Sequence, residues 1–268
     1  MLQDILAEVY DLTYRSEEIR DDDFIIIGDL RKQIIVINGK IPCYKEVKHL
    51  INEKPQYLFS IGNDRYFTVF EDVESNDYMA VRRLFPLVDN KEAFAASTGY
   101  HLNYWYRTHQ YCGTCGNKMI PYHRERAMHC QKCGNVVYPV IAPAVIIALI
   151  KGDSILMSQY AHRSYKGRAL LAGFCEIGET PEETCKREVM EEVGLRIKNI
   201  RYFGSQPWGI DSNLLLGYVV EADGDDPIVL DENELAKAVW VKREDIEYSS
   251  ELKSLTATMI EAFRLGKI

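Results

Sequence analysis

Long apolar runs are missing from this sequence. The longest, Val140 to Ile150, contains Pro143 and is shorter than the roughly 20 residues that a helix needs to span a bilayer. The first thirty residues also lack the basic-then-apolar pattern of a secretory signal peptide. We therefore expect a cytoplasmic protein that makes no membrane contact.

Positive charge is scarce as well. The 268 residues include 32 Lys and Arg against 40 Asp and Glu, a formal net charge of -8. This balance excludes a positive field over the whole molecule that would attract nucleic acid. It does not exclude a local basic groove. The length suits two domains, or one domain with an appended module.

Four of the seven cysteines form two pairs. Cys112 and Cys115 are separated by two residues, as are Cys130 and Cys133, and fourteen residues lie between the pairs. This spacing is typical of a zinc ribbon, with redox disulfides as the alternative. Four thiolates fill the coordination sphere, so we expect one structural Zn²⁺ per chain. Cys43, Cys175 and Cys185 are expected to be buried thiols.

Residues 173 to 195 indicate a loop that leads into a helix. Thr180 and Glu183 have the spacing of a capping box, and Pro181 occupies the first helical position. Gly194 is suited to the left-handed conformation that ends a helix. The helix should therefore run from about residue 181 to 193.

Three glutamates share one arc of that helix. Glu188, Glu191 and Glu192 stand at i, i+3 and i+4, where like charges repel by a few tenths of a kcal/mol per pair. A hard divalent cation, Mg²⁺ or Mn²⁺, would reverse this repulsion. The alternative is a solvated acidic face. However, nine positions fit the pattern Gly-x5-Glu-x7-Arg-Glu-U-x-Glu-Glu-x-Gly-U, where U is bulky and aliphatic. Average residue usage gives that match by chance roughly once in ten million such chains.

This pattern is the Nudix box, and the chain resembles the NADH pyrophosphatase branch of the Nudix hydrolases. The branch cleaves NADH or NAD⁺ and also removes NAD caps from RNA. The resemblance covers about residues 80 to 268 and rests on four features. They are the ribbon, Tyr138-Pro139 with Ala142-Pro143, the box, and Ser205-Gln206-Pro207-Trp208.

We expect three domains: an N-terminal α/β domain over 1–107, the ribbon over 108–136, and the catalytic domain over 137–268. Strands alternating with two helices in the last region predict an α/β/α sandwich with a mixed sheet. The expected strands are Val140–Ile150, Ser154–Gln159, Leu170–Cys175, Ile200–Ser205, Leu214–Glu221, Ile228–Leu230 and Ala238–Lys242, before a helix over Glu251–Arg264.

The N-terminal region shows no catalytic constellation, and we expect a structural or dimerising role. Its apolar spacing predicts a helix through Leu2, Ile5, Val9 and Leu12, and strands at Phe24–Ile27 and Ile34–Ile37. A hairpin is expected from Tyr57–Ile61 and Tyr66–Phe70, and a helix capped by Asp89 and Glu92 that runs towards Trp105.

The resemblance implies roles for individual residues. The main metal ligands are Glu188 and Glu192, with Glu191, Glu234 and the carbonyl of Ala172 beside them. Glu191 is the expected general base and Glu179 the second choice, while Arg187 orients a neighbouring carboxylate. The substrate contacts are Arg82 or Arg83, Glu125, Tyr138, Gln206, Pro207, Trp208, Gly209, Ile210, Asp211, Ser212 and Asn213. His162 and Arg163 lie in a loop that could meet phosphate, although a solvated loop is the default.

The chain departs from the branch in one place. The branch reads Ser-Gln-Pro-Trp-Pro-Phe-Pro-x-Ser, whereas residues 209 to 211 here are Gly-Ile-Asp. The loss of two prolines and a phenylalanine predicts a looser loop that carries a negative charge.

Two other functions therefore stay open beside NADH or NAD⁺ hydrolysis. One is a broader hydrolase of ADP-ribose, FAD or diadenosine polyphosphates. The other is a non-catalytic nucleotide sensor or RNA-binding module that uses the ribbon. A homodimer is expected from the family resemblance.

Overall fold

The computed structural model describes residues 1–5, 9–161, 169–248 and 253–268. These residues separate into two compact units. The N-terminal unit comprises Leu2–Ile141 together with Trp208–Ser212, and the box unit comprises Met1, Ala142–Pro207 and Asn213–Ile268. The zinc ribbon therefore belongs to the same compact unit as the N-terminal region.

The N-terminal unit contains a four-stranded sheet in the order β1-β4-β5-β2. Its strands are β1 (Tyr10–Asp11), β4 (Gln56–Ile61), β5 (Asp64–Thr68) and β2 (Phe24–Ile26). The antiparallel pairing of β4 with β5 confirms the predicted hairpin. A separate pair is formed by β3 (Gln33–Ile35) and β6 (Tyr78–Ala80).

The predicted helix over residues 2 to 12 is wrong in the described part of that range. Tyr10 and Asp11 pair with the edge of β4 instead. The Tyr10 ring packs edge-on against Phe59 and Phe94, with centroid distances of 5.5 and 5.0 Å. Tertiary packing of this aromatic side chain therefore overrides the helical spacing of the local apolar residues.

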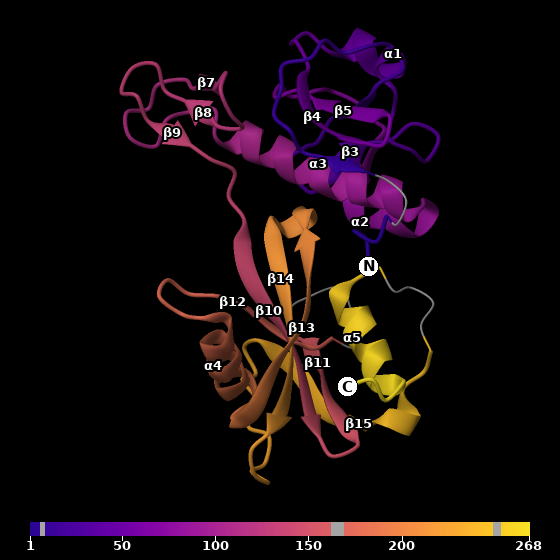
Figure 1. Ribbon diagram of the computed structural model, residues 1–268, viewed down its shortest axis with the longest axis vertical. Helices are drawn as coiled ribbons and strands as arrows, with labels where there is room; N and C mark the ends of the chain where they lie inside the picture. The colour runs from indigo at the N-terminus through magenta and orange to yellow at the C-terminus, as the bar shows by residue number, and fades with distance from the viewer. Residues whose placement is uncertain (6–8, 162–168, 249–252) are drawn as a thin grey trace. The chain divides into compact units, whose positions relative to one another are not determined.

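Helix α3 (Asn90–Thr108) is the longest helix of the N-terminal unit and runs along its sheet (Figure 1). Asp89 caps it by accepting a hydrogen bond from the backbone N–H of Glu92 at 2.8 Å, as the sequence predicts. The Glu92 carboxylate, which was expected to share in the cap, accepts instead from the N–H of Ile41 at 2.8 Å. The helix buries Phe94, Tyr100 and Trp105 among residues of the sheet. Its buried side chains therefore form much of the core against which the shorter elements of this unit pack.

The remaining elements of this unit are short. They are α1 (Tyr44–Val47), η1 (Lys48–Leu50), α2 (Val81–Leu84), η2 (Phe85–Leu87), η3 (Gly209–Asp211) and the ribbon strands β7 (Ile120–Pro121), β8 (Met128–His129) and β9 (Val136–Val137). Arg126 of the ribbon donates to the carbonyl of Leu12 at 3.2 Å, and the Tyr14 hydroxyl donates to the carbonyl of Tyr122 at 2.7 Å. These bonds join the ribbon to the N-terminal segment.

The box unit contains a mixed sheet in the order β13-β14-β10-β11-β15, with β12 pairing with β10. Strands β10 and β14 are parallel, whereas β12 and β11 pair with β10 in antiparallel fashion. The strands are β10 (Ala142–Lys151), β11 (Ser154–Tyr160), β12 (Leu171–Phe174), β13 (Ile197–Trp208), β14 (Asn213–Ala222) and β15 (Leu235–Lys242).

Two apolar cores cover the two faces of this sheet. Alternate residues of β10 divide between them: Val145, Ile147 and Leu149 pack with helix α4 (Pro181–Val193). Ile146 and Ala148 instead lie in the core that includes α5 (Leu255–Arg264). The helices flank the sheet in Figure 1. This period-two division confirms the predicted α/β/α sandwich.

Two other expected elements differ from the prediction. Residues 228–230 form no strand, because Val229 donates its N–H to the carbonyl of Val193 at 3.0 Å, at the end of α4. Helix α5 begins at Leu255 after its cap Ser254, and the predicted start at 251 lies outside the described residues. A further short helix, η4, spans Arg243–Asp245. Within the described ranges, the helices are all too short or too polar to cross a bilayer.

The cap of α3 gives a first prediction. Asp89→Ala removes the oxygen that accepts from the Glu92 N–H and should lower the free energy of unfolding by about 1 kcal/mol. Asp89→Asn keeps an accepting oxygen and should cost much less. Chemical denaturation of the zinc-loaded protein measures both. An equal loss for the two variants would mean that the carboxylate acts through its charge rather than as a cap.

Candidate active site and zinc site

Helix α4 has the boundaries that the sequence predicts. Thr180 and Glu183 form a reciprocal capping box, and Pro181 occupies the first turn. Gly194 ends the helix with φ = 69°, the left-handed conformation that glycine adopts without strain. These local contacts fix where the helix begins and therefore which residues face the sheet.

The apolar stripe of α4 controls the burial of the glutamates. Cys185, Val189 and Val193 are fully buried against the sheet. Their neighbours Glu188 and Glu192 are only 8% and 1% exposed. The Glu191 side chain, by contrast, remains 58% exposed. The structure thus separates two buried carboxylates from one at the surface.

Gly173 of β12 provides the space for Glu188. A Cβ added at Gly173 would lie 1.9 Å from Cδ of Glu188, far inside van der Waals contact. The first glycine of the box is therefore required by the close approach of a carboxylate. Ala172, whose carbonyl the family resemblance nominates as a metal ligand, is the preceding residue of the same strand.

Arg187 connects the other charged residues of the box. Its Nε and Nη2 donate to the two carboxylate oxygens of Glu179 at 2.7 and 2.9 Å. Its Nη1 donates to Glu188 at 2.7 Å and to Glu191 at 2.9 Å. The bidentate contact with Glu179 has the geometry that we expected of Arg187.

Glu179 is held by further donors. The hydroxyl of Thr184 and the N–H of Glu176 donate to its Oε2 at 2.9 and 3.1 Å. Hydrogen bonding by Arg187 is the main reason that the pKa of Glu179 falls to about 2. Glu179 is therefore ionised at neutral pH. Thr184 was not singled out from the sequence, since nothing about a threonine in the first turn of a helix distinguishes this contact.

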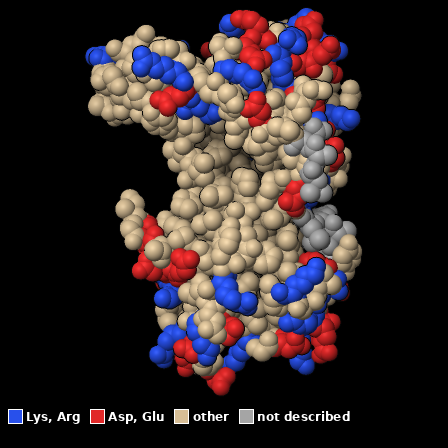
Figure 2. Space-filling model, in the orientation of Figure 1, with Lys and Arg blue, Asp and Glu red and all other residues tan. Residues whose placement is uncertain are grey.

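The surroundings of Glu188 suit a divalent cation. Burial raises the pKa of Glu188, Arg187 opposes that shift, and the charges of Glu191 and Glu234 add to it. The segment that carries Glu234 is tied to α4, because Asp231 donates its N–H to the carbonyl of Glu192 at 3.1 Å. Buried and mutually repelling carboxylates are the hard oxygen donors that Mg²⁺ and Mn²⁺ take. Figure 2 shows further acidic residues over the start of α4, where Glu182 and Glu183 lie.

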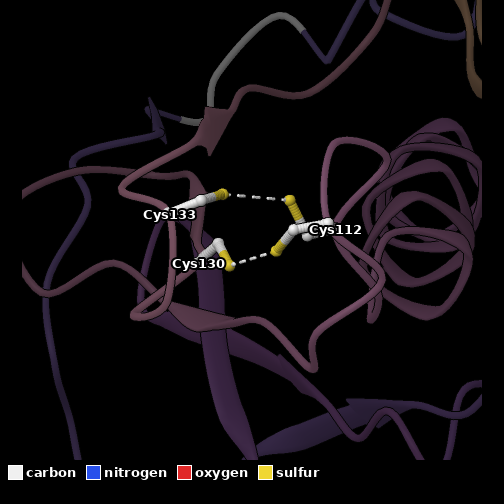
Figure 3. A group of neighbouring side chains, drawn as sticks. Cys112, Cys130 and Cys133 are labelled. Atoms are coloured by element: carbon white, nitrogen blue, oxygen red, sulfur yellow. Dashed lines mark hydrogen bonds between the residues drawn. The ribbon is translucent and has the colours of Figure 1, made fainter.

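The four paired cysteines converge on one point in the N-terminal unit. The Sγ atoms of Cys112 and Cys133 lie 3.6 Å apart, and those of Cys115 and Cys130 lie 3.5 Å apart (Figure 3). All four sulfur atoms lie within 4.8 Å of one another. Tetrahedral zinc with Zn–S bonds of about 2.3 Å requires a sulfur separation of about 3.8 Å. The arrangement fits Zn²⁺ and is too wide for disulfides, whose sulfurs are about 2 Å apart.

The two knuckles have matching backbone turns. The N–H groups of Gly116 and Gly134 donate to the carbonyls of Cys112 and Cys130 at 2.8 and 2.9 Å. Both glycines have positive φ, 70° and 78°. Burial would raise the pKa of Cys112, but hydrogen bonds to its sulfur from backbone N–H groups and from the side chains of Cys133 and Asn135 together lower the pKa to about 6. The turns thus favour the thiolate that zinc binds.

The residues proposed for substrate contact fall into two groups. Tyr138 donates its hydroxyl to Oε1 of Glu125 at 2.8 Å, so the ribbon region brings this pair together. Arg82 and Arg83 are exposed on α2 of the same unit. Pro207 is exposed and Asn213 is buried, both in the box unit. His162 and Arg163 lie outside the described residues.

Gln206 does not have the role expected of it. Its side chain is fully buried, donates to the carbonyl of Lys253 at 2.9 Å and accepts from the N–H of Leu255 at 2.6 Å. It therefore joins β13 to the start of α5 and offers substrate no surface. Sequence alone could not separate a buried amide of this kind from an exposed one.

The expectation of a loose loop at Gly209–Asp211 is also wrong. These residues form the short helix η3, in which Gly209 and Ile210 are buried. Trp208 packs edge-on against Phe85 at 5.7 Å, and Ser212 ends the helix in the left-handed conformation. Lys32 forms an ion pair with Asp211 and offsets its charge. Packing thus provides the order that the missing prolines would have given.

Comparison with known families agrees with this geometry. Residues 140–263 match the model of the NUDIX domain. This part of the chain is a Nudix domain. Residues 107–138 match the NADH pyrophosphatase zinc ribbon domain, which covers the four converging cysteines. Nudix hydrolases use Mg²⁺ or Mn²⁺, and the four converging cysteines of the ribbon form a site for a structural Zn²⁺.

Relatives that carry the name of an NAD-capped RNA hydrolase resemble more than half of this chain. The chain is 42% identical to the NAD-capped RNA hydrolase NudC of Escherichia fergusonii over 171 residues, 64% of this chain and 66% of that protein. It is 44% identical to the protein of that name from Escherichia coli K12 over 151 residues, 56% and 58% of the two chains. The matches thus span less than two thirds of each relative. A NUDIX hydrolase from Nitrosomonas europaea superposes with a TM-score of 0.49 at 20% identity, covering 59% of this chain and 93% of that one.

A substitution at position 173 tests whether Glu188 needs the space beside Gly173 to bind a metal ion. Gly173→Ala should displace the Glu188 carboxylate and weaken Mn²⁺ binding by roughly 10–100-fold, the effect typical of misplacing a ligand's support. Titration calorimetry or the EPR signal of free Mn²⁺ measures the affinity. Gly204→Ala on β13 is the control, because a Cβ there meets nothing within 4 Å. Unchanged Mn²⁺ affinity in Gly173→Ala would contradict the assignment of Glu188 as a ligand.

The zinc site gives another prediction. Cys112→Ser should lose the single zinc per chain and lower the melting temperature of the protein, because one of four ligands is gone. Cys43→Ser, which changes a cysteine outside the cluster, should keep the zinc. Metal content after dialysis decides the matter. Retention of stoichiometric zinc by Cys112→Ser would show that Cys112 is not a ligand.

Proposed function

We propose that the chain hydrolyses the pyrophosphate bond of NADH or NAD⁺, releasing AMP and nicotinamide mononucleotide. One observation carries the proposal: α4 holds two nearly buried carboxylates, Glu188 and Glu192, and that of Glu188 fills the space where a side chain at Gly173 would lie. The NADH pyrophosphatase type of the zinc ribbon and the names of the relatives support this choice of substrate.

The reaction adds water to one phosphorus and breaks its bond to the bridging oxygen. When bound, the divalent cation neutralises phosphate charge and makes a coordinated water more acidic. The proposed ligands are Glu188, Glu191, Glu192, Glu234 and the carbonyl of Ala172. Glu191 is the proposed base that accepts the proton of the attacking water, since its carboxylate is the exposed one of the three on α4.

Arg187 and Glu179 serve this arrangement by orientation. Glu179 engages Arg187 through both oxygens, which leaves Nη1 aimed at Glu188 and Glu191. Because its pKa is only about 2, Glu179 is a weak base at neutral pH. This favours Glu191 over Glu179 for the proton transfer.

Removal of NAD caps from RNA is the proposed second activity, since it breaks the same bond in a longer substrate. A broader hydrolase of ADP-ribose, FAD or diadenosine polyphosphates is the nearest alternative. A silent nucleotide sensor or RNA-binding module has no need of the buried carboxylates, which cost stability without a cation.

We also propose domain boundaries, an oligomeric state and a cellular location for the chain. The proposed domains are 1–107, 108–136 and 137–268, and the matches of residues 107–138 to the ribbon and of 140–263 to the Nudix domain support them. A homodimer follows from the family resemblance alone. A cytoplasmic location is proposed because the four converging cysteines must stay reduced to bind zinc.

Replacement of the buried carboxylates tests the catalytic assignment. Glu188→Gln or Glu192→Gln should lower kcat for NADH by about 100-fold or more while the circular dichroism spectrum stays native, since each loses charge at the metal site. Glu232→Gln changes an exposed carboxylate of the same unit and should leave kcat unchanged. Near-normal turnover in either buried variant with saturating Mg²⁺ or Mn²⁺ would refute the assignment.

Product analysis tests the substrate. The purified protein is incubated with NADH, NAD⁺, ADP-ribose, FAD, diadenosine tetraphosphate and a 5′-NAD RNA, and the products are separated by chromatography. The proposal expects AMP with nicotinamide mononucleotide from the first two, and a 5′-monophosphate RNA from the last. Faster turnover of ADP-ribose or FAD than of NADH would favour the broader hydrolase.

A further inference from the structure

The residues that depart from the family pattern are built into the N-terminal unit. Gly209 donates its N–H to the hydroxyl of Ser97 on α3 at 3.1 Å, in a buried contact. A Cβ at position 209 would lie 2.1 Å from the backbone oxygen of Ser97, which cannot move aside without shifting α3. Proline fits neither condition, since it brings a Cβ and removes the N–H. Glycine at 209 is therefore required by this contact.

Asp211 joins two side chains from different parts of the sequence. Its Oδ2 accepts from Nε1 of Trp208 at 3.0 Å. Its Oδ1 accepts from Nζ of Lys32, which lies in the connection before β3. The indole of Trp208 is also held by its edge contact with the buried Phe85. One carboxylate thus fixes the orientation of the aromatic side chain that remains in the motif.

The backbone of Lys32 is itself held in place. Lys32 has φ = 64°, a left-handed conformation that costs a non-glycine residue energy. Its N–H donates to the hydroxyl of Tyr100 at 3.0 Å, and its carbonyl accepts from the N–H of Val81 at 3.0 Å. Val81 begins α2, so Lys32 is anchored beside the helix that carries Arg82 and Arg83.

We propose that Lys32 is a positioning residue that holds the Trp208 indole through Asp211 for binding of the dinucleotide. The contacts take over the stiffening that proline residues would supply at 209 and 211. The role in binding rests on the proposed function, whereas the fixing of the indole does not. Exposed ion pairs contribute little to folding, so the effect should appear in Trp208 and not in the stability of the protein.

The test compares Lys32→Ala, Lys32→Arg and Lys45→Ala. Lys45 is the matched control, because its side chain is 53% exposed against 57% for Lys32 and it pairs with Asp22 in the same unit. The indole N–H signals of ¹⁵N-labelled protein are recorded, with Trp208→Phe identifying the signal of Trp208. Steady-state kinetics with NADH give KM and kcat separately.

In Lys32→Ala we expect the Trp208 indole N–H to shift and to exchange with solvent at least about threefold faster, KM to rise about three- to tenfold, and kcat to stay within about twofold. Lys32→Arg should restore both readouts, and Lys45→Ala should alter neither. An unchanged Trp208 signal in Lys32→Ala overturns the proposal whatever the kinetics show. A changed signal with unchanged KM overturns the role in binding.

The two proposals fail in different ways. If the wild-type protein turns over none of the dinucleotides, the proposed function fails, and the role in binding fails with it. The Trp208 signal still decides whether Lys32 fixes the indole. If turnover is present and the signal is unmoved, only the inference about Lys32 fails.

Discussion

The site depends on the burial of negative charge on one face of α4. A carboxylate removed from water is costly unless a partner offsets its charge. Glu188 and Glu192 are almost completely buried because the apolar residues of the same helix are drawn onto the sheet. Arg187 supplies one hydrogen bond to Glu188 and divides its remaining donors between Glu179, Glu191 and a carbonyl. A single guanidinium therefore leaves excess negative charge, which is the condition that a divalent cation satisfies.

The sheet makes this burial possible because α4 packs against one of its faces and α5 against the other. Alternate side chains of β10 enter the core beneath α4 or the core beneath α5, so neither helix can rotate without exposing apolar surface. The rotation of α4 about its axis decides which glutamates are buried. The catalytic arrangement is in this sense a consequence of ordinary packing, with the capping box of Thr180 and Glu183 setting the starting residue.

Much of the fold and of the candidate site could be predicted from short patterns in the sequence. The boundaries of α4, the cap of α3, the β4–β5 hairpin and the zinc cluster each depend on residues close in sequence, where spacing determines geometry. The predictions were wrong where contacts with residues far along the chain determine the local structure. Tyr10 enters a strand because of aromatic rings far along the chain, and Gln206 turns inward to meet the start of α5. The sequence predicted that Arg187 orients a neighbouring carboxylate, as it does through two hydrogen bonds to Glu179. Nothing in the sequence indicated that Thr184 also donates to Glu179.

Two glycines show why residue type alone misleads. The sequence suggests flexibility at Gly209 and gives no reason for Gly173 beyond its place in the box, yet each stands where another group approaches too closely for a side chain. At Gly173 that group is a buried carboxylate, and at Gly209 it is a helix carbonyl. In both cases the group that packs against the glycine holds the backbone in one arrangement, and it can do so because no Cβ occupies that space. A glycine that replaces proline in a substrate loop can therefore leave the loop as ordered as before, provided that a buried partner takes up the contact.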